Sequence, residues 1–188
     1  MVNRIKLLNQ NEASEQSQEL LNQAQKKFGK IPNVFKMMSN SSAVLRAYFD
    51  FSGALAQGKL DPQIQERIGL LIAEKNGCEY CLAAHSMISK GAGLSEEEIM
   101  LARKGKSNDK KADAALLFAA EVFEYTGDLD DATLNKIRLA GFSDEEILEI
   151  AAAVSLNILT NSLNNIAHTQ VDFPKAKECS GCSCGCSN

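Results

Sequence analysis

The chain has 188 residues, 45% of them hydrophobic and 23% charged, and its formal net charge at pH 7 is −4. This length allows one large domain or two small ones, and the composition is that of a globular protein. The mildly acidic balance without a basic cluster argues against a nucleic-acid partner. The polar N-terminus has no apolar signal core, and no apolar run reaches the roughly 20 residues that span a bilayer. We therefore expect a cytoplasmic protein with no membrane partner.

Start and stop signals divide the chain into a series of helices. Serine or aspartate side chains suited to N-caps precede most of them, and glycine follows several. The expected helices span residues 14–28, 33–39, 41 or 42 up to Gly58, 61–76, 79–91, 95 onward, 110–125, a shorter one ending at Ala140, and 143–167. Because alternating β-branched runs are absent, the predicted fold class is all-α.

Two helix starts share one pattern. Gly93–Ile99 and Gly141–Ile147 both read G-x-S-x-E-E-I, and Ser95 with Glu98, like Ser143 with Glu146, predicts a capping box. The repetition indicates either a weak internal repeat of helical hairpins or a good helix start used twice.

The end of the chain differs from the rest. Pro174 is expected to end the folded part, so that residues 1–174 form one all-α domain. Residues 175–188 have no apolar periodicity and read as a flexible, cysteine-rich tail.

Residues 66–85 carry the reactive side chains around which the chain is organised. Cys78 and Cys81 stand in C-x-x-C spacing, and His85 follows the second cysteine by one helical turn. The first turn of a helix favours a thiolate at Cys81, and His85 at i+4 can take and return the thiol proton. Cys78 is close enough for a disulfide, so one thiolate can attack and the other can resolve the product. Glu66, on an apolar stripe with small residues, is expected to be buried and to orient His85.

Plainer interpretations exist for each part of this motif. A C-x-x-C pair alone is weak evidence for catalysis, and a zinc site of Cys78, Cys81, His85 and a fourth ligand is the chemical alternative. That spacing is tight for structural zinc and lacks a second, distant pair. Tyr80 is expected to serve packing rather than proton transfer, and Glu74 and Glu79 are expected to be solvated charges.

The stretch E-R-x-x-L-x-x-x-x-x-N-G-C-E-Y-C-x-x-x-H resembles the carboxymuconolactone decarboxylase and alkylhydroperoxidase D (AhpD) superfamily, in particular its peroxidase-related branch. Further similarity, at residues 31–34, 93–99, 140–143 and 160–174, extends it over most of residues 28–174. The resemblance implies an AhpD-like helical bundle, homo-oligomers (dimers, trimers or hexamers) and thiol-dependent reduction of hydroperoxides. It also implies site roles: Cys81 attacks, Cys78 resolves, and Glu66 with His85 relays protons.

One position departs from that family. AhpD proper has a histidine just before the second cysteine, where this chain has Tyr80. This departure puts the full proton relay in doubt and leaves the dithiol reductant open. The decarboxylase members lack the cysteine pair, so lactone decarboxylation is not expected.

The last long helix carries several polar residues. Asn161 and Asn165 are i+4 neighbours, with His168 near the next step. Asparagine is a poor helix former, so we expect a hydrogen-bonding duty at an interface, in helix packing or at the site.

Four cysteines in C-x2-C-x-C-x-C spacing end the chain: Cys179, Cys182, Cys184 and Cys186. Four soft ligands suit a thiophilic metal ion such as zinc or copper(I), or a metalloid such as trivalent arsenic. Alternatively, the tail is a mobile dithiol that carries electrons to the central disulfide, or an inert end.

Two functions therefore stand. The first is a thiol peroxidase or disulfide oxidoreductase of peroxiredoxin type, an antioxidant enzyme whose central site requires no cofactor. The second is a soft-metal or metalloid-binding protein, or a redox switch, that uses the tail cysteines.

Overall fold

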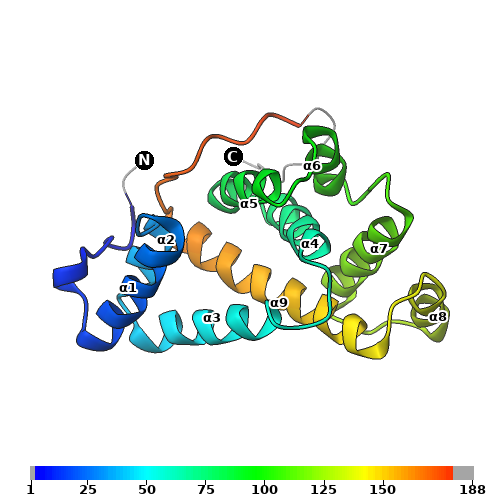
Figure 1. Ribbon diagram of the computed structural model, residues 1–188, viewed down its shortest axis with the longest axis horizontal. Helices are drawn as coiled ribbons and strands as arrows, with labels where there is room; N and C mark the ends of the chain where they lie inside the picture. The colour runs from blue at the N-terminus through cyan, green and yellow to red at the C-terminus, as the bar shows by residue number, and fades with distance from the viewer. Residues whose placement is uncertain (1–2, 180–188) are drawn as a thin grey trace.

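The computed structural model describes residues 3–179, apart from the side chain of Lys27, and consists of helices joined by short turns (Figure 1). Within this part of the chain there is no strand, which confirms the all-α fold class. A 3-10 turn, η1 (Gln10–Glu12), precedes the α-helices. These are α1 (Glu15–Phe28), α2 (Asn33–Met38), α3 (Ser42–Leu55), α4 (Pro62–Lys75), α5 (Glu79–Gly91), α6 (Glu96–Arg103), α7 (Lys110–Tyr125), α8 (Asp131–Leu139) and α9 (Asp144–Ala167).

The helix boundaries follow the local capping signals closely. The side chains of Ser14, Ser41 and Asp61 each accept a hydrogen bond from a backbone N–H in the first turn of the helix they precede. Gly29 ends α1 with φ +72°, a conformation that glycine adopts without steric cost. Helix α3 ends at Leu55, before the expected stop at Gly58.

Helix α4 lies at the centre of the molecule and contacts α5, α6, α7 and α9. Residues 67–74 of α4 are all buried, because this stretch is apolar on every side except for Arg67 and Glu74. Around it lies the main core, whose largest fully buried side chains are Ile68, Leu70, Ile72, Ile99, Leu116, Ile137, Ile150 and Val154.

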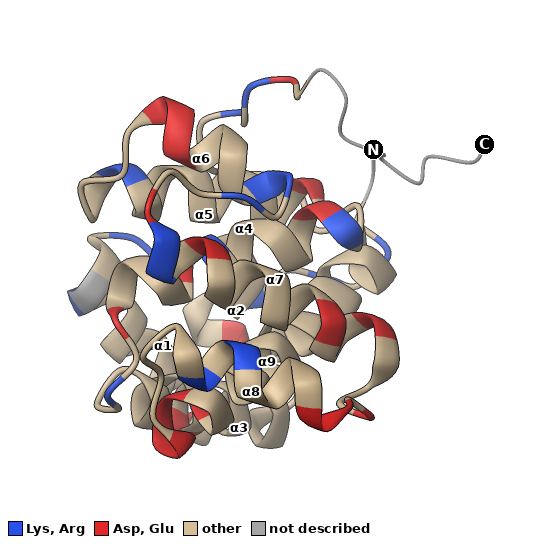
Figure 2. Cartoon of the chain, turned by 90° about the vertical axis from the view of Figure 1, so that its right-hand side faces the viewer, with Lys and Arg blue, Asp and Glu red and all other residues tan. Residues whose placement is uncertain are grey.

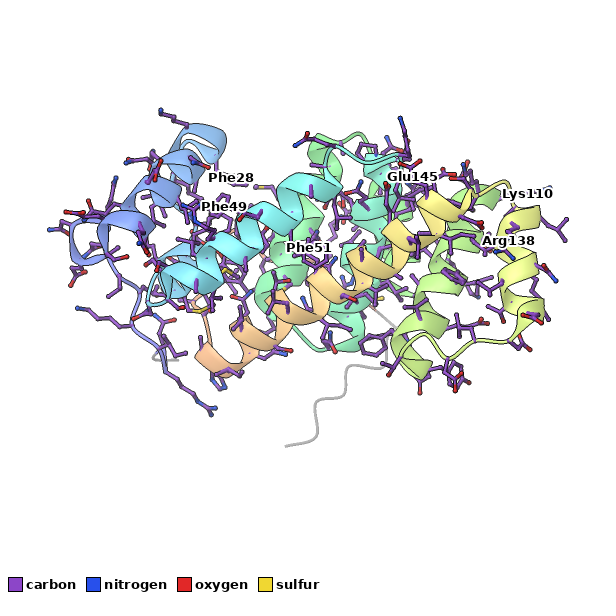
Figure 3. All side chains as sticks on the ribbon, turned by 90° about the horizontal axis from the view of Figure 1, so that it is seen from below. Phe28, Phe49, Phe51, Lys110, Arg138 and Glu145 are labelled. Atoms are coloured by element: carbon purple, nitrogen blue, oxygen red, sulfur yellow. A yellow bond between two sulfur atoms is a disulfide. The ribbon has the colours of Figure 1, made fainter. Side chains whose placement is uncertain are left out.

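A second cluster holds the N-terminal helices. Leu20, Leu21, Phe35, Met38 and Leu45 of α1, α2 and α3 pack together with Ala167 at the end of α9. Helices α3 and α9 lie side by side across the molecule, as the view from below shows (Figure 3). The C-terminal end of α9 is thereby fixed beside α2, and this positions its polar residues next to the cysteine pair.

Glu74 is not the solvated charge expected from the sequence. Its side chain and that of Arg103 are each 5% exposed, and Arg103 Nε donates to Glu74 Oε2 at 2.7 Å. A buried carboxylate needs such a partner, and the arginine that supplies it lies 29 residues further along the chain. Glu79, by contrast, is exposed as expected. On the face seen in Figure 2, acidic and basic residues are interspersed.

The two similar helix starts are only partly alike. Ser143 and Glu146 form the full capping box. Ser95 caps α6, but the Glu98 carboxylate instead accepts hydrogen bonds from Arg67 Nη2 at 2.9 Å and from Ser107 Oγ at 2.6 Å. Within residues 3–179 the similarity therefore covers the serine cap and not the glutamate, whose position is determined by tertiary contacts.

Helix α9 modifies the expectation about membranes. By length and composition it is the one helix of the described residues that could cross a bilayer, with a mean hydropathy of 1.2 over its most apolar window. It packs against α3, α4 and α7, and a core helix can have the same composition. Cytoplasmic localisation stays a prediction.

The chain after α9 runs back over the body toward α6 (Figure 1). Phe173 and Ala176 of this C-terminal segment pack against a third cluster, formed by Ala73, Cys78, Tyr80, Cys81 and Leu82. The carbonyl of Lys177 accepts a hydrogen bond from Arg103 Nη1. The domain boundary at residue 174 stays a prediction, although contacts with the body continue past it.

Candidate thiol site

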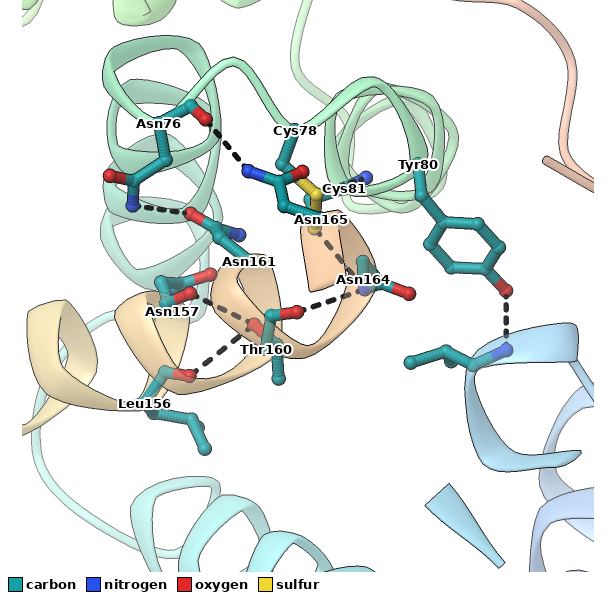
Figure 4. The surroundings of a disulfide bond; sticks show 11 residues. Asn76, Cys78, Tyr80, Cys81, Leu156, Asn157, Thr160, Asn161, Asn164 and Asn165 are labelled. Carbon is teal, nitrogen blue, oxygen red and sulfur yellow. Dashed lines mark hydrogen bonds between the residues drawn. A yellow bond between two sulfur atoms is a disulfide. The ribbon is translucent and has the colours of Figure 1, made fainter. Parts of the chain in front are cut away.

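The turn between α4 and α5 positions the cysteine pair. Gly77 adopts φ +59°, a left-handed conformation that glycine takes without steric cost after a helix, and Cys78 then becomes the N-cap residue of α5. Cys78 Sγ accepts a hydrogen bond from the Cys81 N–H at 3.3 Å, and the two sulfurs form a disulfide (Figure 4). The helix N-terminus thus contacts the Cys78 sulfur directly, whereas the sequence interpretation assigned its effect to Cys81.

The two sulfurs differ in access. Cys78 is fully buried, while Cys81 is 4% exposed and lines a cavity. The lining of that cavity does not include Cys78. Of the pair, Cys81 is therefore the cysteine that a molecule in the cavity would meet.

His85 and Glu66 contact each other across the two helices. His85 Nδ1 lies 2.9 Å from Glu66 Oε2, and each side chain is 21% exposed, so the expected burial of Glu66 is incomplete. Gly69 on α4 makes this contact possible. A Cβ atom at position 69 would lie 2.5 Å from Cε1 of His85, far inside van der Waals contact.

Burial by itself lowers the pKa of His85, but the negative charge and hydrogen bond of Glu66 outweigh it. A hydrogen bond with the Asn157 side chain acts in the same direction, and together they raise the pKa of His85 above its ordinary value. The Glu66 carboxylate thus stabilises the protonated form of the imidazole.

The cavity in front of Cys81 measures about 90 Å³. Its walls are mainly aromatic and apolar, with Cys81, His85, Thr160 and Asn164 as the polar members. The aromatic lining residues are Phe28, Phe35, Tyr48, Tyr80 and Phe173. Burial, followed by the charge of Glu66, raises the pKa of Tyr48 to about 12, so its hydroxyl is neutral near pH 7. The site offers a small organic molecule an apolar pocket beside the Cys81 sulfur and the His85 imidazole.

Tyr80, between the cysteines, is held by structural hydrogen bonds. Its hydroxyl donates to Asp172 Oδ1 at 2.8 Å and accepts from the Val34 N–H at 3.1 Å. Phe173 packs edge-on against its ring. Burial raises the pKa of Tyr80, which disfavours proton transfer and agrees with the packing role that we expected.

Asparagines of α9 face the site, but only some were identified from the sequence. Asn161 Oδ1 accepts from Asn76 Nδ2, and Asn165 Nδ2 donates to the Asn76 carbonyl, both at 2.9 Å. These two bind the turn that carries the cysteines. His168 instead ends α9 in a left-handed conformation, φ +50°.

Two further asparagines act on the reactive side chains themselves. Asn157 raises the pKa of His85, and Asn164 Nδ2 lies 3.4 Å from Cys81 Sγ. Neither was identified from the sequence. The spacing 157, 161, 164 places the three asparagines on one helix face, which indicates a shared hydrogen-bonding surface but not the site that this surface meets.

The predicted metal site lies mostly outside the described residues. Cys182, Cys184 and Cys186 fall beyond residue 179, and Cys179 is partly buried near the end of the described chain. Among residues 3–179 no three histidine, cysteine, aspartate or glutamate side chains are grouped to hold a metal ion. Metal binding by the tail stays a prediction.

Comparisons with known proteins agree with this architecture. The family model of carboxymuconolactone decarboxylases matches residues 42–125. No curated protein sequence matches. An AhpD-core, uncharacterized peroxidase-related protein from Ralstonia eutropha JMP134 superposes with a TM-score of 0.83 at 24% identity, covering 92% of this chain and 93% of that one.

Two other solved structures are similar. A peroxidase-related protein from Silicibacter sp. TM1040 gives a TM-score of 0.77 at 22% identity over 89% of both chains. A variant of the debrominase Bmp8 in complex with 2,3,4-tribromopyrrole gives 0.75 at 20% identity, over 92% of this chain and 93% of that one. At these identities the likeness establishes the fold.

Proposed function

Since the chain belongs to the carboxymuconolactone decarboxylase and AhpD-like superfamily, we propose that it is a thiol-dependent peroxidase that reduces small organic hydroperoxides. The observation that carries the proposal is the 2.9 Å contact between His85 and Glu66 beside a cavity that Cys81 lines. Cys78, already bonded to Cys81, supplies the second thiol that such a reaction needs.

The first step is attack by Cys81. In the reduced protein His85 takes the Cys81 thiol proton, and Glu66 stabilises the imidazolium. The thiolate attacks the hydroxyl-bearing oxygen of the hydroperoxide. An S–O bond forms, the O–O bond breaks, and the departing alkoxide takes the proton from His85 and leaves as an alcohol.

The second step closes the disulfide. The Cys78 thiolate attacks the Cys81 sulfur of the resulting sulfenic acid, the S–O bond breaks, and hydroxide leaves as water after taking up the Cys78 proton. One hydroperoxide and two thiols thus give one alcohol, one water and the disulfide. An external dithiol then reduces the disulfide by thiol exchange and is itself oxidised. We expect the working form to be a homo-oligomer, as the resemblance to the AhpD-like superfamily implies.

Dithiol-dependent consumption of tert-butyl hydroperoxide tests this function. Cys81→Ser should abolish turnover, because no other sulfur lines the cavity within residues 3–179. Cys78→Ser should permit one reaction and leave a sulfenic acid on Cys81, which dimedone would label. A matched control replaces all four tail cysteines by serine and should keep the wild-type rate. Full turnover by Cys81→Ser would overturn the proposal.

A second reaction of the same site is reductive dehalogenation of a small haloaromatic. Its support is the ring of five aromatic side chains around the cavity, together with the fold shared with a debrominase. The balance is the same: two thiols become a disulfide, the carbon–halogen bond is replaced by carbon–hydrogen, and halide and a proton leave. Bromide release from a bromopyrrole by the reduced protein, absent in Cys81→Ser, would support this reaction.

The alternative function, soft-metal or metalloid binding by Cys179, Cys182, Cys184 and Cys186, remains a proposal based on donor chemistry. It predicts stoichiometric zinc or copper(I) in protein purified without chelator, measured by elemental analysis. A protein that binds neither zinc nor copper(I) nor arsenite would contradict this function.

A further inference from the structure

The carboxamide of Asn164 lies against the sulfur of Cys81. Its Nδ2 is 3.4 Å from Cys81 Sγ and 3.0 Å from the Thr160 carbonyl oxygen, and the residue is 4% exposed. A backbone carbonyl only accepts hydrogen bonds, so Thr160 determines which end of the amide faces the sulfur. The NH₂ group is therefore fixed toward the reacting atom by the helix that carries it.

The other end of this amide is turned away from the sulfur. Asn164 Oδ1 is buried and has no hydrogen-bond partner among the described residues, whereas buried polar atoms are nearly always satisfied. Figure 4 shows the nitrogen toward Cys81 and the oxygen on the opposite side. Because Asn164 lines the same cavity as Cys81 and His85, a molecule bound in that cavity can supply the missing donor.

We propose that Asn164 is a catalytic residue with two duties at the Cys81 sulfur. Its Nδ2–H donates to the thiolate and stabilises it, as hydrogen bonds to charged acceptors do. Its Oδ1 accepts from the O–H of the bound hydroperoxide and turns the hydroxyl-bearing oxygen toward Sγ. That proton stays on the transferred oxygen, so the sulfenic acid keeps the same acceptor. The second duty rests on the proposed function, and the first does not.

The donor is tested by the reactivity of the thiol, without any peroxide. In the reduced full-length protein, alkylation of Cys81 by iodoacetamide is followed by peptide mass spectrometry across a pH series. Asn164→Leu, similar in volume but apolar, should raise the pKa of the Cys81 thiol and slow alkylation at pH 7 about ten-fold. Asn164→Asp, which adds a negative charge, should slow it further.

The matched control is Thr169→Val. Thr169 follows the C-cap residue of α9 and is also buried, but it does not line the cavity. This nearly isosteric variant should leave the pH profile of Cys81 alkylation unchanged, and circular dichroism melting verifies that both variants are folded. A profile for Asn164→Leu equal to wild type would overturn the donor role.

The acceptor is tested by comparing two rates. Iodoacetamide needs only the thiolate, whereas the hydroperoxide also needs Oδ1. Asn164→Leu should therefore lose more in the single-turnover rate with tert-butyl hydroperoxide than in alkylation, by about a further ten-fold. Equal losses would overturn the acceptor role. If Cys81 of the wild-type protein is alkylated rapidly but does not react with the hydroperoxide, the proposed function is refuted and the donor role of Asn164 still stands.

Discussion

At the scale of single residues, the absence of one side chain determines where the imidazole lies. Gly69 leaves room for His85 against α4, since a Cβ there would fall 2.5 Å from Cε1 and 2.6 Å from Nδ1 of the ring. The ring cannot yield without leaving Glu66, because Nδ1 is the atom that contacts the carboxylate.

We expect Gly69→Ala to displace His85 and to lower peroxide turnover about 100-fold, since misplaced catalytic groups cost that much. Alanine is the better helix former by about 1 kcal/mol, so a gain in propensity accompanies the loss of activity. Gly53→Ala is the control: this glycine of α3 has nothing within 4 Å of its added Cβ. It should keep full turnover. Equal activity of both variants would contradict the role of Gly69.

The Glu66–His85 pair also predicts a pH dependence. Glu66 raises the pKa of His85 above 6.5, so their contact stabilises the fold fully below pH 6.5 and loses that effect as pH rises through the raised value. In Glu66→Gln burial dominates, and the pKa of His85 should fall. NMR titration can resolve this change, because the chain has only one other histidine, His168, as an internal reference. An unchanged His85 titration would refute the assignment.

The side chains that the sequence identified share a local signal. Cys78, Cys81 and His85 stand within one turn and one helix, so their spacing alone brings them together. Glu66 could be added because its helix carries small residues. Asn157 and Asn164 could not be assigned to this site from spacing alone, since α9 reaches it only through the packing of the whole chain.

At the scale of helices, local capping determined most boundaries, while buried charges depended on distant partners. Ser14, Ser41, Asp61 and Ser143 cap the helices that their positions predict. Glu74 looks like a solvated charge in sequence because Arg103, its partner, lies on another helix. A helix start depends on neighbouring residues, whereas an ion pair between α4 and α6 depends on the tertiary fold.

Removing Arg103 should therefore be costly. Arg103→Met leaves the Glu74 carboxylate buried without its guanidinium, and breaking a buried pair in this way costs roughly 3 kcal/mol or more. Arg138→Met is the matched control, because Arg138 pairs with Asp144 on the surface, where such pairs contribute less than about 1 kcal/mol. Urea denaturation measures both free energies of unfolding. Similar losses in the two variants would contradict the importance of burial.

At the scale of the whole molecule, the C-terminal segment joins parts of the chain that lie far apart in sequence. Asp172 accepts a hydrogen bond from Tyr80 and pairs with Lys30, and Phe173 lines the cavity. Arg103 holds the segment again at Lys177. The segment therefore forms one wall of the site and leads directly to the four tail cysteines, which makes the wall and the tail separable by experiment.

Two changes distinguish the wall from the tail. Phe173→Ala removes an aromatic wall from the cavity and should raise KM for tert-butyl hydroperoxide about ten-fold, equivalent to about 1.4 kcal/mol of binding. Its effect on kcat should be smaller, since the proton relay consists of His85 and Glu66. An unchanged KM in Phe173→Ala would show that substrate does not bind against this wall.

A chain ending at Glu178 lacks all four tail cysteines but keeps the wall. With a small dithiol as reductant, it should turn over at the wild-type rate, because the central pair carries the chemistry. Turnover that requires the tail would instead make the tail cysteines the electron carriers to the Cys78–Cys81 disulfide.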